Sequence, residues 1–194
     1  MCPRVPMYVL ATTIALMTGS PVASAKSSDA YVKEARQYLD KGETKAAVIQ
    51  LKNALQEDPS DVQARLMLGS LHLGNGDGAA AAKEFGRARD LGADRQSWIL
   101  GYARALMLQG KRQALLQEVA VDPALPAPMR AELHALRGNA KLALGEIEAA
   151  VVEYNAALGL EPDNAMARLG KARILLAEGS EAEALGELDL IVAE

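Results

Sequence analysis

The stretch GETKAAVIQLKNALQEDPSDVQA, residues 42–64, returns with altered letters as GEIEAAVVEYNAALGLEPDNAMA at residues 145–167. Nine of the 23 positions are identical, among them the first glycine, the Ala-Ala-Val after it, the later Ala-Leu and the proline. Both stretches keep a turn glycine, small helical residues and a helix-stopping proline. The likeness therefore predicts a repeated helical unit.

A glycine recurs along the chain at a nearly fixed interval. Spacings of 34, 34, 35 and 34 residues separate Gly42, Gly76, Gly110, Gly145 and Gly179. A fixed period of 20 to 50 residues marks a repeat protein, and 34 residues is the length of a known helix-turn-helix unit. We expect each glycine just after the first helix of its repeat, where a left-handed φ is needed.

A 34-position frame brings five repeats into register, at residues 28–61, 62–95, 96–130, 131–164 and 165–194, the last being incomplete. The eighth position is always small and holds Ala35, Gly69, Ala103, Gly138 and Ala172. The twenty-fourth position is large and apolar and holds Leu51, Phe85, Val119, Tyr154 and Leu188. The two helices of each repeat are thus expected to approach closely, with the large side chain filling the space that the small one leaves.

The ends of the repeats carry helix signals. Pro59 and Pro162 are expected to stop second helices, and Asp61 and Asn164 beyond them can cap the helices that follow. The third repeat differs, because it has one extra residue and the proline-rich segment at residues 122–128. Its second helix should end near Val121, before an extended connection that is either a loop insertion or a functional hinge.

Composition favours helices and limits the chemistry. Half of the residues are hydrophobic but only seven of the 194 are aromatic, so Ala and Leu must build the core, and an all-α fold is expected. The net charge is −4 without a basic block, which argues against nucleic acid as a partner. Cys2 is the only cysteine, so disulfides and Cys-based metal sites are not expected.

The first 25 residues differ from the rest of the chain. Arg4 precedes an apolar run over residues 7–17, and the small-residue pattern at residues 23–25 follows a helix-breaking Gly-Ser-Pro. These features predict a secretory signal peptide over residues 1–25, cleaved after Ala25, and hence export to the periplasm. The alternative is an uncleaved envelope anchor, although the run is shorter than the roughly 20 residues that a membrane-spanning helix needs.

Over residues 28–194 the frame resembles tetratricopeptide repeats (TPR), which implies a right-handed α-solenoid of about five repeats. The usual aromatic at the fourth position is present only as Tyr31. The segments KAAVIQLKNALQEDPSDVQARLMLG and RAELHALRGNAKLALG most resemble the N-terminal part of PEP-CTERM/exosortase-system TPR proteins (PrsT type). That resemblance implies a link to protein sorting or exopolysaccharide export, although no lipobox cysteine follows the apolar run and such proteins carry more repeats.

No residue pattern points to catalysis, a cofactor or a metal ion. His72 and His134 occupy positions that aromatic packing residues normally fill, so we expect both to pack or to face solvent rather than to act as ligands or bases. The segment GNGDGAAAA lacks the Lys-Ser/Thr of a phosphate loop and is expected to be a turn between helices. The sequence therefore predicts a protein that is not an enzyme.

The resemblance implies instead a protein or peptide partner, held in a concave groove lined by the first helices. Its fifth and twelfth positions form an apolar floor and its ninth positions a polar row with three arginines, which suits an apolar or acidic-apolar segment. Alternatively, the apolar residues merely pack between helices. The candidate groove residues are Arg36, Leu39, Leu66, Ser70, Leu73, Leu100, Arg104, Met107, Asn139, Leu142, Leu169, Arg173 and Leu176.

Three functions are compatible with these patterns. The first is a scaffold that binds a protein partner in the bacterial cell envelope. The second is a purely structural N-terminal segment of a longer TPR solenoid, and the third is the accessory domain of an envelope hydrolase.

Overall fold

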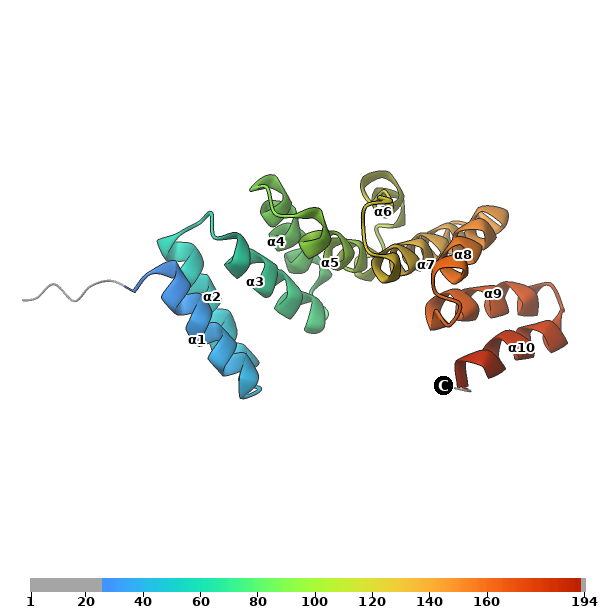
Figure 1. Ribbon diagram of the computed structural model, residues 1–194, viewed down its shortest axis with the longest axis horizontal. Helices are drawn as coiled ribbons and strands as arrows, with labels where there is room; N and C mark the ends of the chain where they lie inside the picture. Colours follow the sequence, from blue (N-terminus) through green and yellow to red (C-terminus); the bar gives the residue numbers. More distant parts are fainter. Residues whose placement is uncertain (1–25, 193–194) are drawn as a thin grey trace, which may run out of the picture.

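The computed structural model describes residues 26–192, so the predicted signal peptide lies outside the described residues. Those residues form ten α-helices and no strand (Figure 1). The helices are α1 (Ser28–Asp40), α2 (Thr44–Glu57), α3 (Val62–Gly74), α4 (Gly78–Asp90), α5 (Arg95–Leu108), α6 (Arg112–Glu118), α7 (Ala127–Ala143), α8 (Ile147–Leu160), α9 (Ala165–Ala177) and α10 (Glu181–Val192). The prediction of an all-α repeat fold is confirmed.

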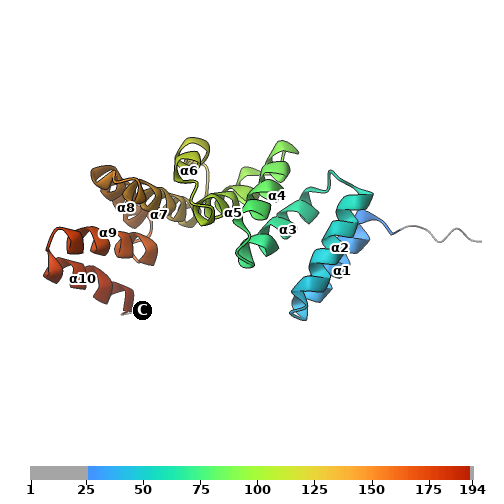
Figure 2. The ribbon, with the colours of Figure 1, turned by 180° about the vertical axis from the view of Figure 1, so that it is seen from behind.

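The helices pack as five antiparallel pairs that follow one another along an arch. Figures 1 and 2 place the pair α1–α2 at one end and the pair α9–α10 at the other. Each second helix contacts the first helix of the next pair, and α3, α5, α7 and α9 also contact one another in sequence. The first helices of the last four pairs therefore form one continuous layer.

The helix starts follow the 34-residue frame with one exception. Helices α1, α3 and α9 begin at the first frame position, and α5 begins one residue before it. Helix α7 begins at Ala127, four residues before the expected Ala131, and continues to Ala143. Pro128 fits this additional first turn, because the first N–H groups of a helix have no partner within the helix. The proline-rich segment is thus partly helical.

The turns between paired helices have the predicted backbone. The five glycines of the ladder have φ values between 69° and 82°, the left-handed region in which a Cβ is costly. Gly92, with a φ of 83°, was not predicted; it ends α4 where the first and fourth repeats use a proline. The predicted caps are also present, because the side chains of Asp61 and Asn164 accept hydrogen bonds from the third residues of α3 and α9 at 2.8 and 3.0 Å.

Large side chains from the second helices fill the space between first helices. The Phe85 ring of α4 is buried against Gly69 in its own repeat and Gly101 in the next. The Tyr154 ring of α8 is buried in the same way against Gly138 and Gly170. A Cβ at any of these glycines would press on the ring it faces. Each ring thus requires two glycines, one on either side.

Smaller side chains at the same frame position have larger neighbours. Leu51 packs in one cluster with Ala35 and with Met67, which stands where the next repeat would place the second glycine. Val119 likewise shares its cluster with Ala103 and Leu136. The volume between two repeats is therefore conserved while its division among the three side chains changes.

The third repeat departs from the prediction. Helix α6 ends at Glu118, three residues before the expected Val121. The connection that follows is anchored, because Val119 and Leu125 are buried and the Arg137 guanidinium donates to the backbone oxygen of Val119 at 2.9 Å. The Arg95 side chain also donates to the backbone oxygen of Ala120 at 2.9 Å. Anchoring to both α5 and α7 favours a loop insertion over a hinge.

The paired glycines generate a stability prediction. Gly101→Ala should lower the free energy of unfolding by about 1–3 kcal/mol, because the new methyl group overlaps the Phe85 ring. This sign is opposite to the gain of up to about 1 kcal/mol that Ala normally brings to a helix interior. Urea unfolding followed by far-ultraviolet circular dichroism measures the change.

Two matched variants separate overlap from helix propensity. Gly86→Ala makes the same substitution inside α4, where a Cβ meets no atom within 4 Å, and it should leave the protein equally stable or more stable. Adding Phe85→Leu to Gly101→Ala should recover part of the loss, because Leu51 coexists with a larger neighbour at the equivalent place. Equal effects of Gly101→Ala and Gly86→Ala would contradict the packing argument.

Candidate functional site

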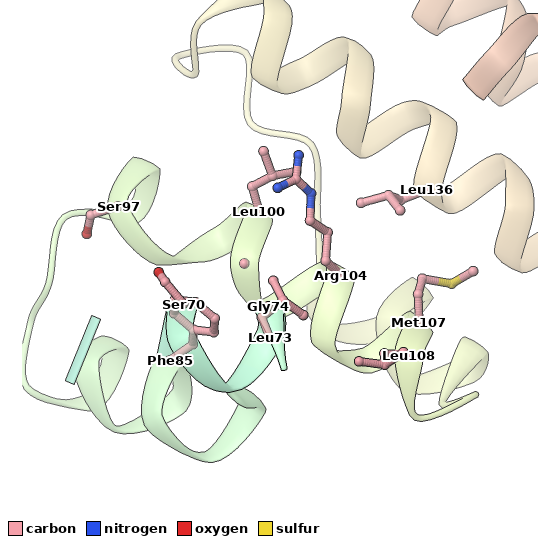
Figure 3. A pocket seen from close by; sticks show the side chains of 11 residues that line it. Ser70, Leu73, Gly74, Phe85, Ser97, Leu100, Arg104, Met107, Leu108 and Leu136 are labelled. Atoms are coloured by element: carbon pink, nitrogen blue, oxygen red, sulfur yellow. The ribbon is translucent and has the colours of Figure 1, made fainter. Parts of the chain in front are cut away.

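A hollow lies between α3 and α5, on the layer of first helices. It has a volume of about 770 Å³ and is open to solvent. Figure 3 shows Leu100, Arg104 and Met107 along α5, with Leu136 of α7 facing them. The lining residues are Ser70, Leu73, Gly74, Phe85, Ser97, Leu100, Gly101, Arg104, Met107, Leu108 and Leu136. We call this space the central hollow.

Two smaller hollows adjoin the central hollow on opposite sides. One, of about 380 Å³, is shared between α1, α3 and α5 and has Ser70 and Ser97 in common with the central hollow. The other, of about 520 Å³, lies at the starts of α7 and α9 and shares Leu100 with it. The three hollows together form a track that crosses the first helices from α1 to α9.

Seven of the predicted groove residues line this track. The central hollow contains Ser70, Leu73, Leu100, Arg104 and Met107, and the hollow toward α1 adds Leu39 and Leu66. Six predicted residues lie outside the three hollows, namely Arg36, Asn139, Leu142, Leu169, Arg173 and Leu176. The structure thus brings together the predicted residues of the second and third repeats with Leu39 of the first, and leaves all of those in the fourth and fifth apart.

Asn139 has an internal partner. Its Oδ1 accepts a hydrogen bond from the hydroxyl of Tyr154 at 2.7 Å, so this side chain contributes to the junction between α7 and α8. Burial raises the pKa of Tyr154 to about 12, so the hydroxyl remains a donor at neutral pH. Leu169 and Leu176, in contrast, are exposed on α9.

In the predicted row of three arginines, the charge of the central one, Arg104, is neutralised by an ion pair. Arg104 donates from Nε to Oε1 of Glu132 on α7 at 2.6 Å, and its Nη2 contacts the same oxygen. Within residues 26–192, Arg36 and Arg173 form no ion pair. The central hollow is therefore close to neutral, while cations stand near both ends of the first-helix layer.

A family model described as tetratricopeptide repeat matches residues 32–95, 67–126 and 135–194, which together are more than half of the chain. The chain belongs to the tetratricopeptide repeat family. A comparison with curated proteins found no match.

Several solved structures share the TPR fold. PilF of Pseudomonas aeruginosa has 24% identity and a TM-score of 0.68, over 86% of this chain and 75% of its own. MamA of Desulfovibrio magneticus RS-1, from residue 41 to its end, has 18% identity and a TM-score of 0.73, over 86% and 93%. YrrB, described as a TPR protein with an unusual peptide-binding site, has 17% identity and a TM-score of 0.63, over 84% of each chain. At these identities the likeness shows the fold alone.

Six residues of the central hollow were missed by the sequence prediction, namely Gly74, Phe85, Ser97, Gly101, Leu108 and Leu136. Ser97 and Leu108 stand at the second and thirteenth frame positions, which line the groove in TPR proteins, so a signal for them was present. Phe85 comes from a second helix and Leu136 from the stacking face of α7, so neither was a groove candidate. Their presence shows that the floor of the hollow is part of the TPR core.

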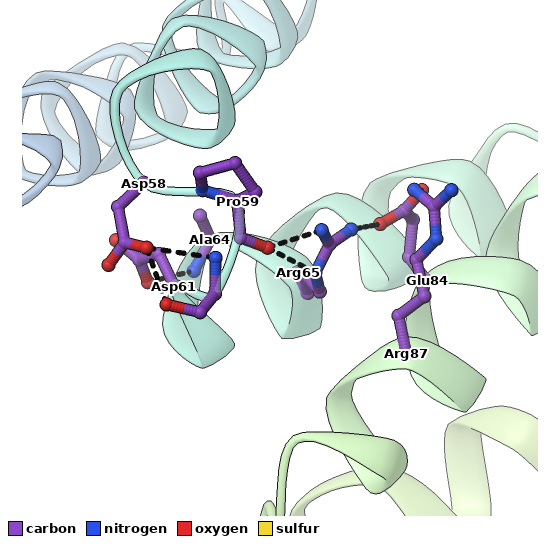
Figure 4. A network of polar contacts seen from close by, with 8 residues as sticks. Asp58, Pro59, Asp61, Ala64, Arg65, Glu84 and Arg87 are labelled. Atoms are coloured by element: carbon purple, nitrogen blue, oxygen red, sulfur yellow. Dashed lines mark hydrogen bonds and ion pairs between the residues drawn. The ribbon is translucent and has the colours of Figure 1, made fainter.

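An arginine replaces the usual TPR aromatic at the fourth frame position of the second repeat, where it makes a buried bridge. In Figure 4, Arg65 lies between the turn of the preceding repeat and α4. Its Nε donates to the backbone oxygen of Pro59 at 3.1 Å, and its Nη1 donates to Glu84 at 2.7 Å. The guanidinium thus joins two repeats through polar contacts where an aromatic residue would use packing.

The last TPR junction contains the same bridge. Arg168 donates from Nη2 to the backbone oxygen of Pro162 at 2.5 Å and from Nη1 to Glu187 at 2.9 Å. Burial raises the pKa of Glu187, but hydrogen bonds from Lys171 and Arg168 and their charges outweigh burial, so this pKa lies below its ordinary value.

Glu153 is the centre of the polar cluster in the fourth TPR. Its carboxylate oxygens lie 2.7 Å from His134 Nδ1, 3.0 Å from Arg137 Nε and 2.9 Å from Lys141 Nζ. Burial raises the pKa of Glu153, but the hydrogen bonds from His134 and Lys141, with the charge of Arg137, outweigh burial and hold this pKa below its ordinary value. His134 is therefore engaged in a contact between α7 and α8.

The remaining expectations concern His72, metal sites and membrane-spanning helices. His72 lies 3.9 Å from Asp77, at the turn between α3 and α4. Over residues 26–192 no three His, Cys, Asp or Glu side chains gather as a metal site would require. In the same part of the chain, no helix has both the length and the apolar character needed to cross a bilayer.

The Glu153 cluster generates a pH prediction. Because the folded pKa lies below the ordinary value of 4.5, the stabilisation is complete above about pH 4.5 and is lost as the pH falls through the folded pKa. Glu153→Gln should lower the free energy of unfolding by about 2 kcal/mol at pH 7 and flatten its fall below pH 4.5. Urea titrations between pH 3 and pH 7 measure both. Glu148→Gln on the exposed face of α8 is the control, and an equal effect of the two substitutions would contradict the cluster's role.

Proposed function

We propose that this TPR array is a scaffold that binds an extended, apolar or acidic-apolar segment of a partner protein along the track from α1 to α9. The observation that carries this proposal is the adjacency of the three hollows, which have a mainly apolar floor. The central hollow shares Ser70 and Ser97 with the hollow toward α1, and Leu100 with the hollow at the starts of α7 and α9. An extended segment can occupy such hollows in succession, because alternate side chains of an extended chain point the same way.

The size and the mainly apolar lining of the central hollow support an apolar anchor residue in the partner. Its floor includes Phe85, Leu73 and Met107, which a leucine-sized or larger side chain of the partner can cover. Buried apolar anchors of this kind contribute most of the affinity in many interfaces. TPR proteins generally mediate contacts between proteins, and YrrB is described as having a peptide-binding site. These facts favour a binding protein over an enzyme, since the TPR fold is typically a non-catalytic scaffold.

The envelope setting is the finer part of the proposal. The basic start, apolar run and small-residue end of residues 1–25 favour export to the periplasm, with an uncleaved anchor as the alternative. The resemblance of residues 45–69 and 130–145 to PEP-CTERM/exosortase-system proteins favours a partner in protein sorting or exopolysaccharide export. Identification of the captured partner by mass spectrometry tests this setting separately from the track.

A purely structural role within a longer solenoid is the second candidate, and the outer face of α10 favours it. Leu185 is exposed, whereas Val48, Leu116 and Val151 at the same frame position are half-buried against the next repeat. A further helix packed on α10 would cover Leu185 in the same way. Capture that is lost on Leu185→Lys but kept when Arg36, Arg104 and Arg173 are replaced would favour this candidate, because the captured protein would then pack on α10 as a further repeat would.

The track makes a charge prediction. Replacing Arg36, Arg104 and Arg173 together with Glu should reduce capture of the partner from envelope extracts at least 10-fold. An acidic-apolar segment would be repelled in the central hollow by the change at Arg104, and near the two ends of the first-helix layer by the changes at Arg36 and Arg173. The control is the triple Glu variant of Lys45, Lys52 and Lys83, which makes the same charge change at exposed sites on α2 and α4.

A second groove variant changes the apolar floor and leaves the arginine row intact. Leu100→Asp puts a carboxylate where two hollows meet, and it should also abolish capture. Circular dichroism establishes that each variant remains helical. Undiminished capture by both groove variants would remove the track as the binding site.

A further inference from the structure

The Arg104–Glu132 ion pair stands at the junction of two hollows of the proposed track. Arg104 lines the central hollow, Glu132 lines the hollow at the starts of α7 and α9, and Leu100 lines both. We infer that Glu132 occupies the place of an acidic side chain of the bound segment, so that this ion pair opens when the segment binds. This inference rests on the proposed function and names the charge that the partner presents beside its apolar anchor.

The pair is exposed enough to exchange. The side chains of Arg104 and Glu132 are 49% and 22% exposed, whereas those of Arg65 and Glu84 are 9% and 10% exposed. Solvent-exposed ion pairs contribute little net stability, because both groups regain water when they separate. Arg65 also holds a backbone carbonyl in the preceding turn, whereas Glu132 is the partner that the structure shows for Arg104. An incoming carboxylate can therefore replace Glu132 at small cost.

One carboxylate oxygen of Glu132 accepts a hydrogen bond from Nε of Arg104 and also contacts its Nη2. This edge of a guanidinium is the one that takes a carboxylate with two parallel hydrogen bonds, so Glu132 and a ligand carboxylate compete for it. The apolar floor around Met107 and Leu136 would hold the neighbouring side chain of the same segment. A neutral segment would leave the pair closed and gain only the apolar contacts.

Charge at the central hollow favours an acidic partner over a basic one. Arg104 is the one charged residue among those that line it, whereas Glu132 and Glu161 line the hollow beside it. Arg104 is the more exposed member of the pair and faces the larger hollow, so a ligand meets it first. Arg36 and Arg173 share its frame position and form no ion pair within residues 26–192, so the row is positive once Glu132 is displaced. A basic segment would instead have to displace Arg104 and remain beside these cations.

The test uses peptides selected on the protein itself. Random 16-residue peptides with amidated ends are selected on the wild-type array by display, and those whose binding requires Leu100 are kept. Each kept acidic peptide is then made with Glu or with Gln at its acidic position. Fluorescence anisotropy gives the dissociation constants for wild type, Glu132→Gln and the control Glu148→Gln. Glu148 lies on α8 outside the track, and its substitution makes the same charge change.

We call the Arg104–Glu132 ion pair that opens on binding the latch. It predicts a distinctive pattern of dissociation constants in these titrations. Glu132→Gln should bind the Glu peptide about 3- to 5-fold more tightly than wild type and the Gln peptide equally well, because removing the competitor helps only an acidic ligand. Glu148→Gln should change neither affinity. Glu132→Ala should give the same pattern, and melting curves show whether either variant is less stable.

The possible failures are distinguishable. Recovery of no peptide that depends on Leu100 would overturn the proposed function and the latch with it. Peptides that depend on Leu100 but bind Glu132→Gln equally well or more weakly would overturn the latch alone. Selection of basic peptides whose affinity falls on Glu132→Gln would show that the hollow prefers a ligand of the opposite charge. That result would also overturn the latch.

Discussion

The structure depends on the packing of one large second-helix side chain between two first helices. Leu51, Phe85, Val119 and Tyr154 are each almost completely buried at the same frame position. A single repeat cannot bury such a side chain by itself, since the second wall of its site belongs to the next repeat. Stability and register therefore arise together at every junction. The fixed space between helices explains why an aromatic ring requires two glycines, while leucine or valine is found with an alanine and a larger neighbour.

The same packing contact also affects where the layer of first helices is hollowed. At Phe85, the flanking Gly69 and Gly101 have no side chains to cover the ring, and the ring reaches the floor of the central hollow. At the equivalent junction, Tyr154 also lies between two glycines, but its hydroxyl is held by Asn139 and its ring lines none of the three hollows. A polar cap on the aromatic side chain thus accounts for a difference between two otherwise matched junctions.

The features that were predictable from sequence are those determined within one repeat. The turn glycines, the caps at Asp61 and Asn164, and the small residues opposite large ones follow from local backbone and side-chain size. The Arg104–Glu132 pair and the contribution of Leu136 to the hollow depend on how α5 meets α7, and no 34-residue pattern encodes that meeting. The early end of α6 was unpredictable for a related reason, since side chains of α5 and α7 bind the backbone oxygens that its last turn leaves free.

Guanidinium groups serve two physical purposes in this array, and burial separates them. Arg65 and Arg168 each join a carbonyl oxygen in the preceding turn to a glutamate on the second helix of their own repeat. The Arg65 bridge is buried and the Arg168 bridge is partly buried, so separating the partners would leave charges with little access to water. These bridges therefore help to hold neighbouring repeats in place. Arg104 has no such constraint, because water reaches both members of its pair. A frame held by such bridges can therefore carry an exchangeable charge on its inner surface. In the proposed binding mode, the repeats would stay in place while a ligand carboxylate replaces one internal contact.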